Sequence, residues 1–221
     1  MRERFEGLDG KRLYLMRHGQ TYEPRLDAPM ATADEDPHLS LTPNGREGVL
    51  ATSKAMADLG LDAAFSSTFH RSHETARLVA EPHGLAVRTH QALQELRLNP
   101  PPGGTLRDVA RKYLGVARDL AAGDASQVSL DCGRSVTEVV TAAQEALHEL
   151  LQGPARRVLV VAHGGINRFL LTGFLGLPLY RFIALDQDFA CVNVIDFVAG
   201  GRPLVRAMNV TCADPFKAGD A

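Results

Sequence analysis

The chain alternates between short apolar runs, which predict buried strands, and longer segments whose apolar residues recur at helical spacing. The clearest strand is residues 157–162, where a continuous Val-Leu-Val-Val run is typical of a central parallel strand. Further strands are predicted at 13–16, 63–66 and 85–88. Because strands and helices alternate, the pattern favours an α/β fold with a mostly parallel sheet between layers of helices.

Local start and stop signals mark the helices. Thr42 followed by Pro43 predicts a helix that runs to about residue 59. Ser135 with Glu138 forms a capping-box pattern, which opens a helix that stops before Gly153. Further helices are predicted at 68–81, 105–122 and 166–175, a loop at 26–38, and an antiparallel hairpin at 191–197 and 204–208. The hairpin adds a late antiparallel edge to the sheet.

Composition limits the domain count and the partners. The 221 residues are 45% hydrophobic, so we expect one domain over 1–221, with its core at about 11–210 and a disordered tail at 213–221. The net charge is -2, and basic and acidic residues are mixed along the chain, which argues against a nucleic-acid partner. Any phosphate site must therefore depend on local charge.

Targeting signals and cysteines bear on the compartment. Residues 1–6 are charged and no apolar core follows them, so no signal peptide is expected. The longest apolar stretch, 169–180, is too short to span a bilayer, so no membrane partner is expected. Cys132, Cys191 and Cys212 are odd in number and widely spaced, which indicates free thiols in a reducing cytoplasm, with one disulfide as the alternative.

A candidate anion site begins where the first apolar run stops at Arg17-His18-Gly19. Open α/β sheets build their ligand sites at the carboxyl ends of the strands. There a guanidinium can hold a phosphate in a fork, and an imidazole can attack phosphorus. The tripeptide alone is equally compatible with a turn that carries an exposed basic pair.

Three later strand ends carry matching residues. Arg71 follows the second strand near a helix start, and Glu95 follows the third strand. His163 and Gly164 follow the strongest strand. Because parallel strands share one carboxyl edge, we expect these residues to gather around the Arg-His-Gly turn.

The order of these motifs resembles the histidine phosphatase superfamily, also called the phosphoglycerate mutase-like family. The matching motifs are Arg17-His18-Gly19 with Thr21, Leu41-Thr42 with Gly45, Ser66-Ser67 with Arg71 and Glu74-Thr75-Ala76, Glu95 after the third strand, and His163-Gly164 after an apolar strand. The match covers about residues 13–193. Each motif is weak alone, but their order and their places at strand ends make the resemblance specific.

The resemblance implies a three-layer αβα sandwich with a mostly parallel central sheet, one antiparallel edge strand and a helical insertion over the active site. It also implies a two-step phosphoryl transfer in which His18 attacks phosphorus and forms a phosphohistidine. Arg17, Arg71 and His163 would hold the phosphoryl oxygens, with help from the backbone near Gly164 at a helix N-terminus.

In the same resemblance, Glu95 would protonate the leaving oxygen and then activate water. Glu74 and Glu81 lie nearby in the sequence and are the alternatives for this acid. The residues expected to contact the substrate are Gln20, Thr21 and Tyr22. No metal or cofactor is implied, because the arginines and the second histidine supply the positive charge.

Several positions depart from the family pattern. Pro24 stands where many members have asparagine, and the chain has no tryptophan for the usual Gly-x-Trp-Glu-Gly segment, replaced here by 96–104. Gly133-Arg134-Ser135 stands in place of Gly-Glu-Ser. These changes argue against a glycolytic mutase activity, and they make 22–38 and 99–131 the expected sources of specificity.

We therefore predict a metal-independent phosphomonoesterase that acts on a small phosphorylated metabolite, either a sugar phosphate or a phospho-acid. The alternatives are a mutase that moves a phosphoryl group within one substrate and a non-catalytic regulatory protein. His70 and His73 are expected at a surface or pocket rim rather than on a metal, because no ligand shell is completed nearby in the sequence. A homodimer is the expected assembly.

Overall fold

Six strands form one mixed sheet in the order β3-β2-β4-β1-β5-β6. The strands are β1 (Arg12–Arg17), β2 (Ala63–Ser66), β3 (Val87–Thr89), β4 (Arg157–Ala162), β5 (Val192–Val198) and β6 (Arg202–Val210). The computed structural model describes residues 5–23, 25–96, 98, 100, 102–123, 126 and 128–212. Strands β1 to β4 are parallel, and β5 pairs antiparallel with β1 and with the edge strand β6. The prediction of a mostly parallel sheet with antiparallel pairing at one edge is confirmed.

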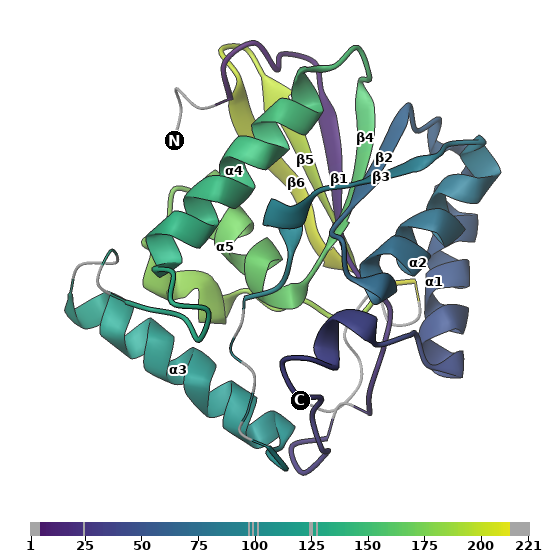
Figure 1. Ribbon diagram of the computed structural model, residues 1–221. Coiled ribbons are helices and arrows are strands. Elements are labelled where there is room, and N and C mark those ends of the chain that lie inside the picture. Colours follow the sequence, from purple (N-terminus) through teal and green to yellow (C-terminus); the bar gives the residue numbers. More distant parts are fainter. Residues whose placement is uncertain are drawn as a thin grey trace.

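Helices pack on both faces of this sheet (Figure 1). The α-helices are α1 (Pro43–Met56), α2 (His70–Ala80), α3 (Leu106–Ala122), α4 (Val136–Gln152) and α5 (Gly164–Phe174). The 3-10 helices are η2 (Asp36–His38), η3 (Ala57–Leu59), η4 (Glu81–His83), η5 (Gln91–Leu93) and η7 (Leu179–Ala184). Helices α1 and α2 pack together on one face, and α4 and α5 pack together on the other. The layers are those of the expected αβα sandwich.

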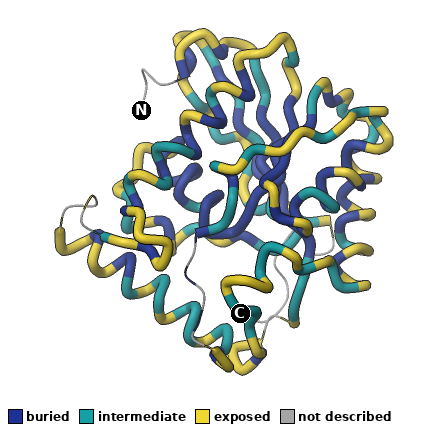
Figure 2. Tube along the Cα trace, in the orientation of Figure 1, coloured by how far each residue is buried: buried dark blue, intermediate teal, exposed yellow. Residues whose placement is uncertain are grey.

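The two faces of the sheet bury separate apolar clusters, and the central strands between them are buried throughout (dark blue in Figure 2). Leu13 and Leu15 of β1 belong to the cluster that includes α4 and α5. Tyr14 and Met16 belong to the cluster that includes α1 and α2. Because side chains alternate along a strand, a strand buried on both faces needs continuous apolar residues.

Most helix starts follow the signals in the sequence. Thr42 Oγ1 accepts a hydrogen bond from Gly45 N at the start of α1. Ser135 and Glu138 exchange the two bonds of a capping box at the start of α4. Two boundaries differ from the prediction: α2 begins two residues late, after an extended Phe69, and α5 begins two residues early. Helix α5 starts early because His163, the residue directly after β4, is the extended residue that precedes the helix, so Gly164 is the first helical residue.

Helix α3 stands off from the layers, beside the loop of residues 25–42 (Figure 1). Backbone hydrogen bonds join the two segments, with Leu106 N donating to Ala28 O and Arg107 N donating to Leu26 O. Helix α3 also packs against η7. It is the helical insertion that the family resemblance implied.

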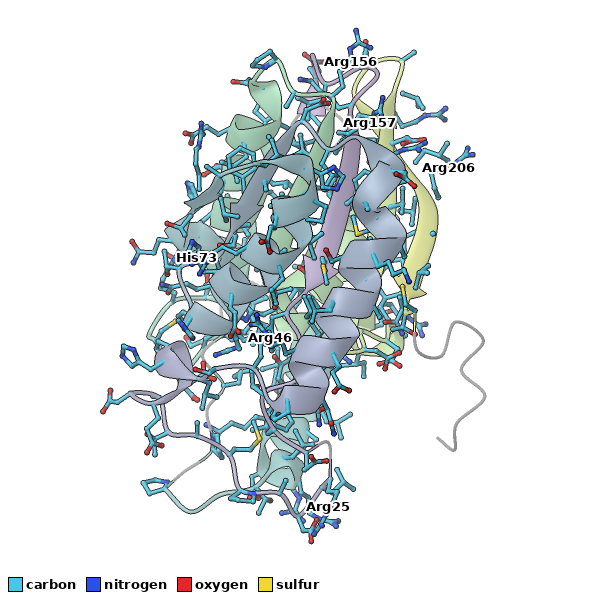
Figure 3. All side chains as sticks on the ribbon, turned by 90° about the vertical axis from the view of Figure 1, so that its right-hand side faces the viewer. Arg25, Arg46, His73, Arg156, Arg157 and Arg206 are labelled. Carbon is cyan, nitrogen blue, oxygen red and sulfur yellow. The ribbon has the colours of Figure 1, made fainter. Side chains whose placement is uncertain are left out.

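Charge and cysteines follow the composition. Figure 3 shows Arg25 at one end of the molecule and Arg156 and Arg157 at the other, so basic side chains are spread over its length. Cys132 and Cys212 are exposed free thiols, and Cys191 is buried with its Sγ donating to Gln187 Oε1 at 3.6 Å. Within the described ranges, each helix is too short or too polar to cross a membrane. Pro24 and the tail at 213–221 lie outside the described residues.

Candidate active site

The register of the sheet brings two histidines together at its carboxyl edge. Arg17 of β1 is paired with Ala162 of β4 in a parallel ladder, so the next residues, His18 and His163, leave adjacent strands side by side. The two ring centroids are 5.1 Å apart. His18 N donates to Ala162 O at 3.1 Å, which extends the pairing one residue beyond β1. The predicted gathering of these two strand ends follows from the register.

His18 is buried, and its contacts select one neutral tautomer. Its Nδ1 lies 2.7 Å from Gly19 O, which can only accept, so Nδ1 carries the proton. Its Nε2 accepts a hydrogen bond from Arg71 Nε at 3.1 Å. Burial, and then the charges of Arg71 and Arg17, hold the pKa of His18 well below its usual value. A neutral imidazole with an unprotonated nitrogen is the form in which histidine acts as a nucleophile.

Arg71 is buried in the first turn of α2 and contacts a carboxylate from the 25–42 loop. Its Nη1 donates to Asp36 O at 2.5 Å, and its Nη2 lies 3.1 Å from Asp36 Oδ2. The guanidinium therefore bridges the imidazole of His18 and the loop. Asp36 was not predicted, because an aspartate in a loop rich in Asp, Pro and Ala carries no signal of its partner.

His163 is fully buried beside His18, and one of its ring nitrogens lacks a partner. Its Nε2 lies 2.7 Å from Ser67 Oγ and 3.2 Å from Ser72 Oγ. Among the described residues, the partners of Ser67 Oγ are Phe69 N, which donates to it, and His163 Nε2, so Nε2 is the acceptor that satisfies the Ser67 hydroxyl proton, and the imidazole proton is then on Nδ1. This Nδ1 has no hydrogen-bond partner among the described residues. Burial, more than any nearby charge, holds the pKa of His163 well below its usual value.

Arg17 lies with its guanidinium against Phe189 and the start of α5. Its Cζ is 3.9 Å from the centroid of the Phe189 ring, and its Nη1 donates to Gln187 O. A Cβ on Gly164 would lie 3.3 Å from Arg17 Nε, so glycine allows this close approach. Arg17 Nε is also buried and unpartnered in the described part of the chain. With His163 Nδ1, it makes two buried N–H donors without acceptors, and buried donors are normally satisfied.

Glu95 accepts three backbone hydrogen bonds near the start of α5. Its Oε2 accepts from Gly165 N at 3.0 Å, and its Oε1 accepts from Ile166 N at 3.1 Å and from Leu96 N at 2.8 Å. A Cβ on Gly165 would clash with both Glu95 Oε1 and Tyr113 Oη. Glycine at this position therefore lets the carboxylate and the phenol meet over the helix N-terminus.

A cavity of about 130 Å³ opens at this edge of the sheet. The predicted residues that line it are Arg17, His18, Arg71, Glu95, Gly164, Thr21 and Tyr22. His163 lies beneath the lining, and Gln20 lies outside it, where its carbonyl accepts from Thr42 N.

Three polar residues that line this cavity were not predicted individually from the sequence: Asp36, Tyr113 and Arg168. The first two nevertheless lie within 22–38 and 99–131, the segments expected to set specificity. A signal did exist for Arg168, which lies four residues after Gly164 and so shares its helix face. Tyr113 shares an apolar face of α3 with Val109, which gives no sign that this face covers a site.

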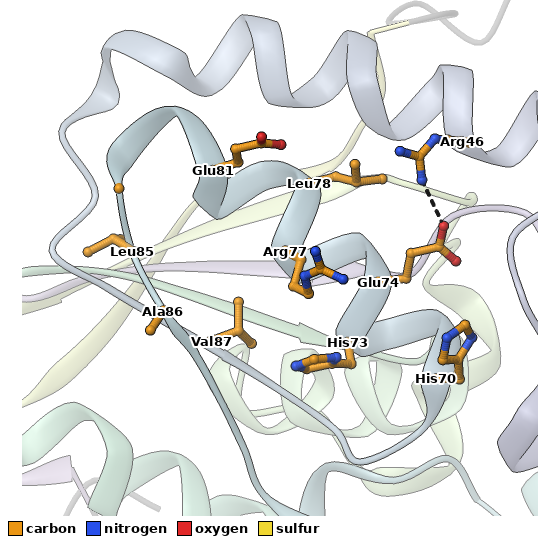
Figure 4. A pocket seen from close by; sticks show the side chains of 11 residues that line it. Arg46, His70, His73, Glu74, Arg77, Leu78, Glu81, Leu85, Ala86 and Val87 are labelled. Atoms are coloured by element: carbon orange, nitrogen blue, oxygen red, sulfur yellow. Dashed lines mark hydrogen bonds and ion pairs between the residues drawn. The ribbon is translucent and has the colours of Figure 1, made fainter.

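A larger cavity of about 740 Å³ lies along the outer side of α2 (Figure 4). His70 and His73 line it, which places both at a pocket rim. Glu74, which pairs with Arg46 at 2.9 Å, and Glu81 also line this cavity rather than the smaller one. Within the described ranges, no group of three or more His, Cys, Asp or Glu is arranged to bind a metal.

Comparison with known sequences gives relatives with named activities. The model of the histidine phosphatase superfamily (branch 1) matches residues 13–211. The chain is 30% identical over 217 residues to 2-carboxy-D-arabinitol-1-phosphatase from Triticum aestivum, across 95% of this chain and 43% of the relative. It therefore spans less than half the length of that relative. It is also 27% identical over 186 residues to the probable phosphoglycerate mutase GpmB of Enterobacter sp. (strain 638), across 84% of each chain.

Among solved structures, YhfR from Bacillus stearothermophilus has a similar fold. The TM-score is 0.71 at 25% sequence identity, over 89% of this chain and 96% of that one. The family model spans all four strand ends that carry the site. On these grounds the chain belongs to the histidine phosphatase superfamily, branch 1.

Proposed function

We propose that the protein is a metal-independent phosphomonoesterase that acts through a phosphohistidine at His18. One observation carries the proposal: the unprotonated Nε2 of His18 accepts from Arg71 beside two buried N–H donors that lack acceptors, on Arg17 and His163. A phosphoryl group in this place would meet a nucleophile and would give the donors their acceptors. Phosphoryl transfer needs little more than positioning and charge stabilisation of this kind.

In the first step, His18 Nε2 attacks phosphorus, the N–P bond forms and the ester P–O bond breaks. Charge in the transition state lies on three equatorial oxygens. Arg17, Arg71 and His163 would each donate to these oxygens. The N-terminus of α5 at Gly164 adds the positive end of a helix dipole.

Glu95 would supply and then remove the proton. It lines the same cavity as His18, and its Oε2 accepts one backbone bond whereas Oε1 accepts two. We assign the proton transfer to Oε2, which has the greater remaining capacity. Glu95 gives a proton to the leaving ester oxygen and later takes one from water, whose oxygen attacks phosphorus. The N–P bond then breaks, inorganic phosphate forms and His18 returns to its neutral state.

A small phosphorylated metabolite is the proposed substrate. The cavity of about 130 Å³ is small beside the roughly 300–1,000 Å³ of pockets for drug-sized ligands. The wheat relative is named a phosphatase of a carboxylated sugar phosphate, which supports sugar phosphates and phospho-acids as classes to test.

The proposal is tested by phosphate release from a panel of phosphomonoesters and by a quench in alkaline detergent with ³²P-labelled substrate. We expect an acid-labile, base-stable label on the wild type and none on His18→Ala, with activity reduced on the order of 10⁴-fold or more. His73→Ala, in the larger cavity, is the matched control and should keep its activity within about twofold. If the wild type hydrolyses no ester and His18→Ala leaves phosphate affinity unchanged, the protein is a non-catalytic member of the family, whereas unchanged activity in His18→Ala would remove His18 as the nucleophile.

A mutase is the second candidate, supported by the relative named as a probable phosphoglycerate mutase. A mutase must keep water from the phosphohistidine until the phosphoryl group returns to the substrate. Product analysis by ³¹P NMR separates the two reactions. An isomerised ester without free phosphate would replace the hydrolase proposal.

We also propose a reducing cytoplasmic location and a homodimeric assembly. The exposed thiols of Cys132 and Cys212 support the location, because exposed free thiols oxidise readily outside a reducing compartment. Exposed Leu204 and Met208 on the edge strand β6 support a second copy at this edge. Light scattering after size exclusion measures the mass, and a monomer at micromolar concentration would contradict the dimer.

A further inference from the structure

Arg168 gives the small cavity a third guanidinium, beside those of Arg17 and Arg71. It lies on α5 one turn after Gly164, so both residues are on the face of the helix that meets the cavity. Its side chain is 26% exposed, and nothing in the proposed phosphate chemistry uses it.

The charge of Arg168 is held in place but is hardly neutralised. Its Nε donates to Leu185 O at 2.7 Å. In the described part of the chain its acidic partner is Asp186, 3.5 Å from Nη2 and 70% exposed. Arg12, by contrast, makes two hydrogen bonds of 2.6 and 2.8 Å to Asp196. A long contact to a solvated carboxylate contributes little, so the charge of Arg168 remains available to a ligand in the cavity.

One short segment holds both Arg168 and Arg17. Arg168 donates to Leu185 O, and Arg17 donates to Gln187 O, two residues further on. Both side chains also line the cavity, so a ligand with two anionic groups can present one of them to each guanidinium.

Tyr113 of α3 adds a neutral hydrogen-bond donor to the lining of the same cavity. Desolvation, and then the charge of Glu95, raise the pKa of the Tyr113 phenol well above its usual value, and the charge of Arg168 opposes this shift. The phenol therefore keeps its proton at neutral pH. A hydroxyl and a guanidinium from two different helices thus line the same cavity.

Resting on the proposed phosphatase function, we propose that Arg168 binds a carboxylate of the substrate and selects phosphorylated acids over neutral phosphate esters. With Nε occupied by Leu185 O, the two Nη groups remain to make paired hydrogen bonds with a planar carboxylate. Arg168 is then a specificity-determining residue, whereas Arg17 and Arg71 bind the phosphoryl group.

The test compares 3-phosphoglycerate with glycerol 3-phosphate, which differ in whether the terminal group is a carboxylate or a neutral alcohol. We expect kcat/KM of the wild type to favour the acid by roughly 10- to 100-fold, and Arg168→Gln to lose that preference by affecting the acid alone. Arg168→Lys should keep part of the preference, because the charge stays but the fork is lost. Arg111→Gln, exposed on α3 and away from the lining, is the matched control and should keep the preference in full.

Two results would overturn the assignment: equal efficiency of the wild type on both esters, or an equal loss on both in Arg168→Gln. Melting temperatures of the variants separate misfolding from lost recognition. A propane-1,3-diyl bisphosphate arm tests the alternative anion, and a preference for it that disappears in Arg168→Gln would replace the carboxylate by a second phosphate.

Binding separates failure of this inference from failure of the proposed function. Calorimetry with His18→Ala measures the affinity for both esters without turnover. If no ester is hydrolysed, the phosphatase proposal fails, whereas tighter binding of 3-phosphoglycerate that needs Arg168 still supports the carboxylate site. If hydrolysis occurs and neither rate nor affinity distinguishes the two esters, the role of Arg168 fails alone.

Discussion

The floor and the roof of the candidate site are built in different ways. The floor comprises Arg17, His18, Arg71 and His163, at strand ends or at the start of the helices that follow them, and Glu95, which follows η5 and is bound by the first backbone N–H groups of α5. The roof comprises the 25–42 loop and α3, which meet the floor through side chains that are only partly buried. The sheet fixes the residues of the floor, which define one reaction. The sheet does not fix the residues of the roof, so these can differ and change which substrates bind. Substitutions in the floor should therefore slow every ester, and substitutions in the roof should change affinity.

The largest of these effects is expected for Glu95→Gln, which leaves the size of the side chain but removes its acid. For alkyl phosphates, kcat/KM, which reports phosphoryl transfer to His18, should fall by roughly 10²- to 10⁴-fold, the usual contribution of a general acid. For p-nitrophenyl phosphate, kcat/KM should fall far less, because its leaving group departs without a proton, whereas kcat should fall for both esters because Glu95 also activates water. Steady-state kinetics on both esters measure the difference.

Glu74→Gln is the matched control for this experiment, since Glu74 lines the larger cavity and should affect neither ester strongly. A loss of equal size in kcat/KM on both esters would give Glu95 a structural role at the start of α5 instead. Full activity of Glu95→Gln would remove it from the mechanism.

A second prediction concerns the histidines of the floor and the pH dependence of folding. Burial holds the pKa values of His18 and His163 below the usual value in the folded protein. The unfolded chain therefore binds more protons below pH 6.5, so stability is lost as the pH falls from about 6.5 toward the folded pKa values. The loss should be roughly 1.4 kcal/mol per histidine for each pH unit, measured by urea unfolding between pH 7 and pH 5.

His18→Asn and His163→Asn should each flatten this dependence, because each removes one group that must be buried without its proton. His73→Asn, which replaces a partly exposed histidine outside the floor, should leave the slope unchanged. Parallel slopes for all variants and the wild type would mean that the buried imidazoles do not differ in protonation between the folded and unfolded states.

The same contrast explains how much could be predicted from the sequence. The floor was predictable because apolar runs identify the parallel strands, and parallel strands bring their carboxyl ends to one edge. The alignment of Arg17 with Ala162 then places His18 beside His163 without further information. The αβα layers follow from the alternation of strands and helices for the same reason.

The roof was not predictable, because its contacts join segments without a shared register. Asp36 meets Arg71 across 35 residues, and Leu106 meets Ala28 across 78, by tertiary contacts that leave no periodic trace. Local starts were missed for a related reason. Before α2, Ser67 Oγ accepts a hydrogen bond from Phe69 N, and no side chain caps the helix. Local bonds of this kind, here within a strand-to-helix turn, compete with capping by a side chain.

The smallest expected effect comes from the ion pair that joins the roof to the floor, between Asp36 and Arg71. In this pair the Asp36 carboxylate accepts from Arg71 Nη2, a donor that the proposed mechanism assigns to the phosphoryl group, so the two anions compete for the guanidinium. Asp36→Asn removes the charge and keeps the shape, and it should lower KM by about fivefold, equivalent to about 1 kcal/mol of lost competition for the guanidinium, while kcat changes little. Asp34→Asn, exposed in the same loop, controls for the general loss of negative charge near the cavity. A higher KM for Asp36→Asn would reverse the interpretation, since Asp36 would then be holding Arg71 in the orientation that binds substrate, and the roof would belong to the phosphate-binding machinery rather than compete with it.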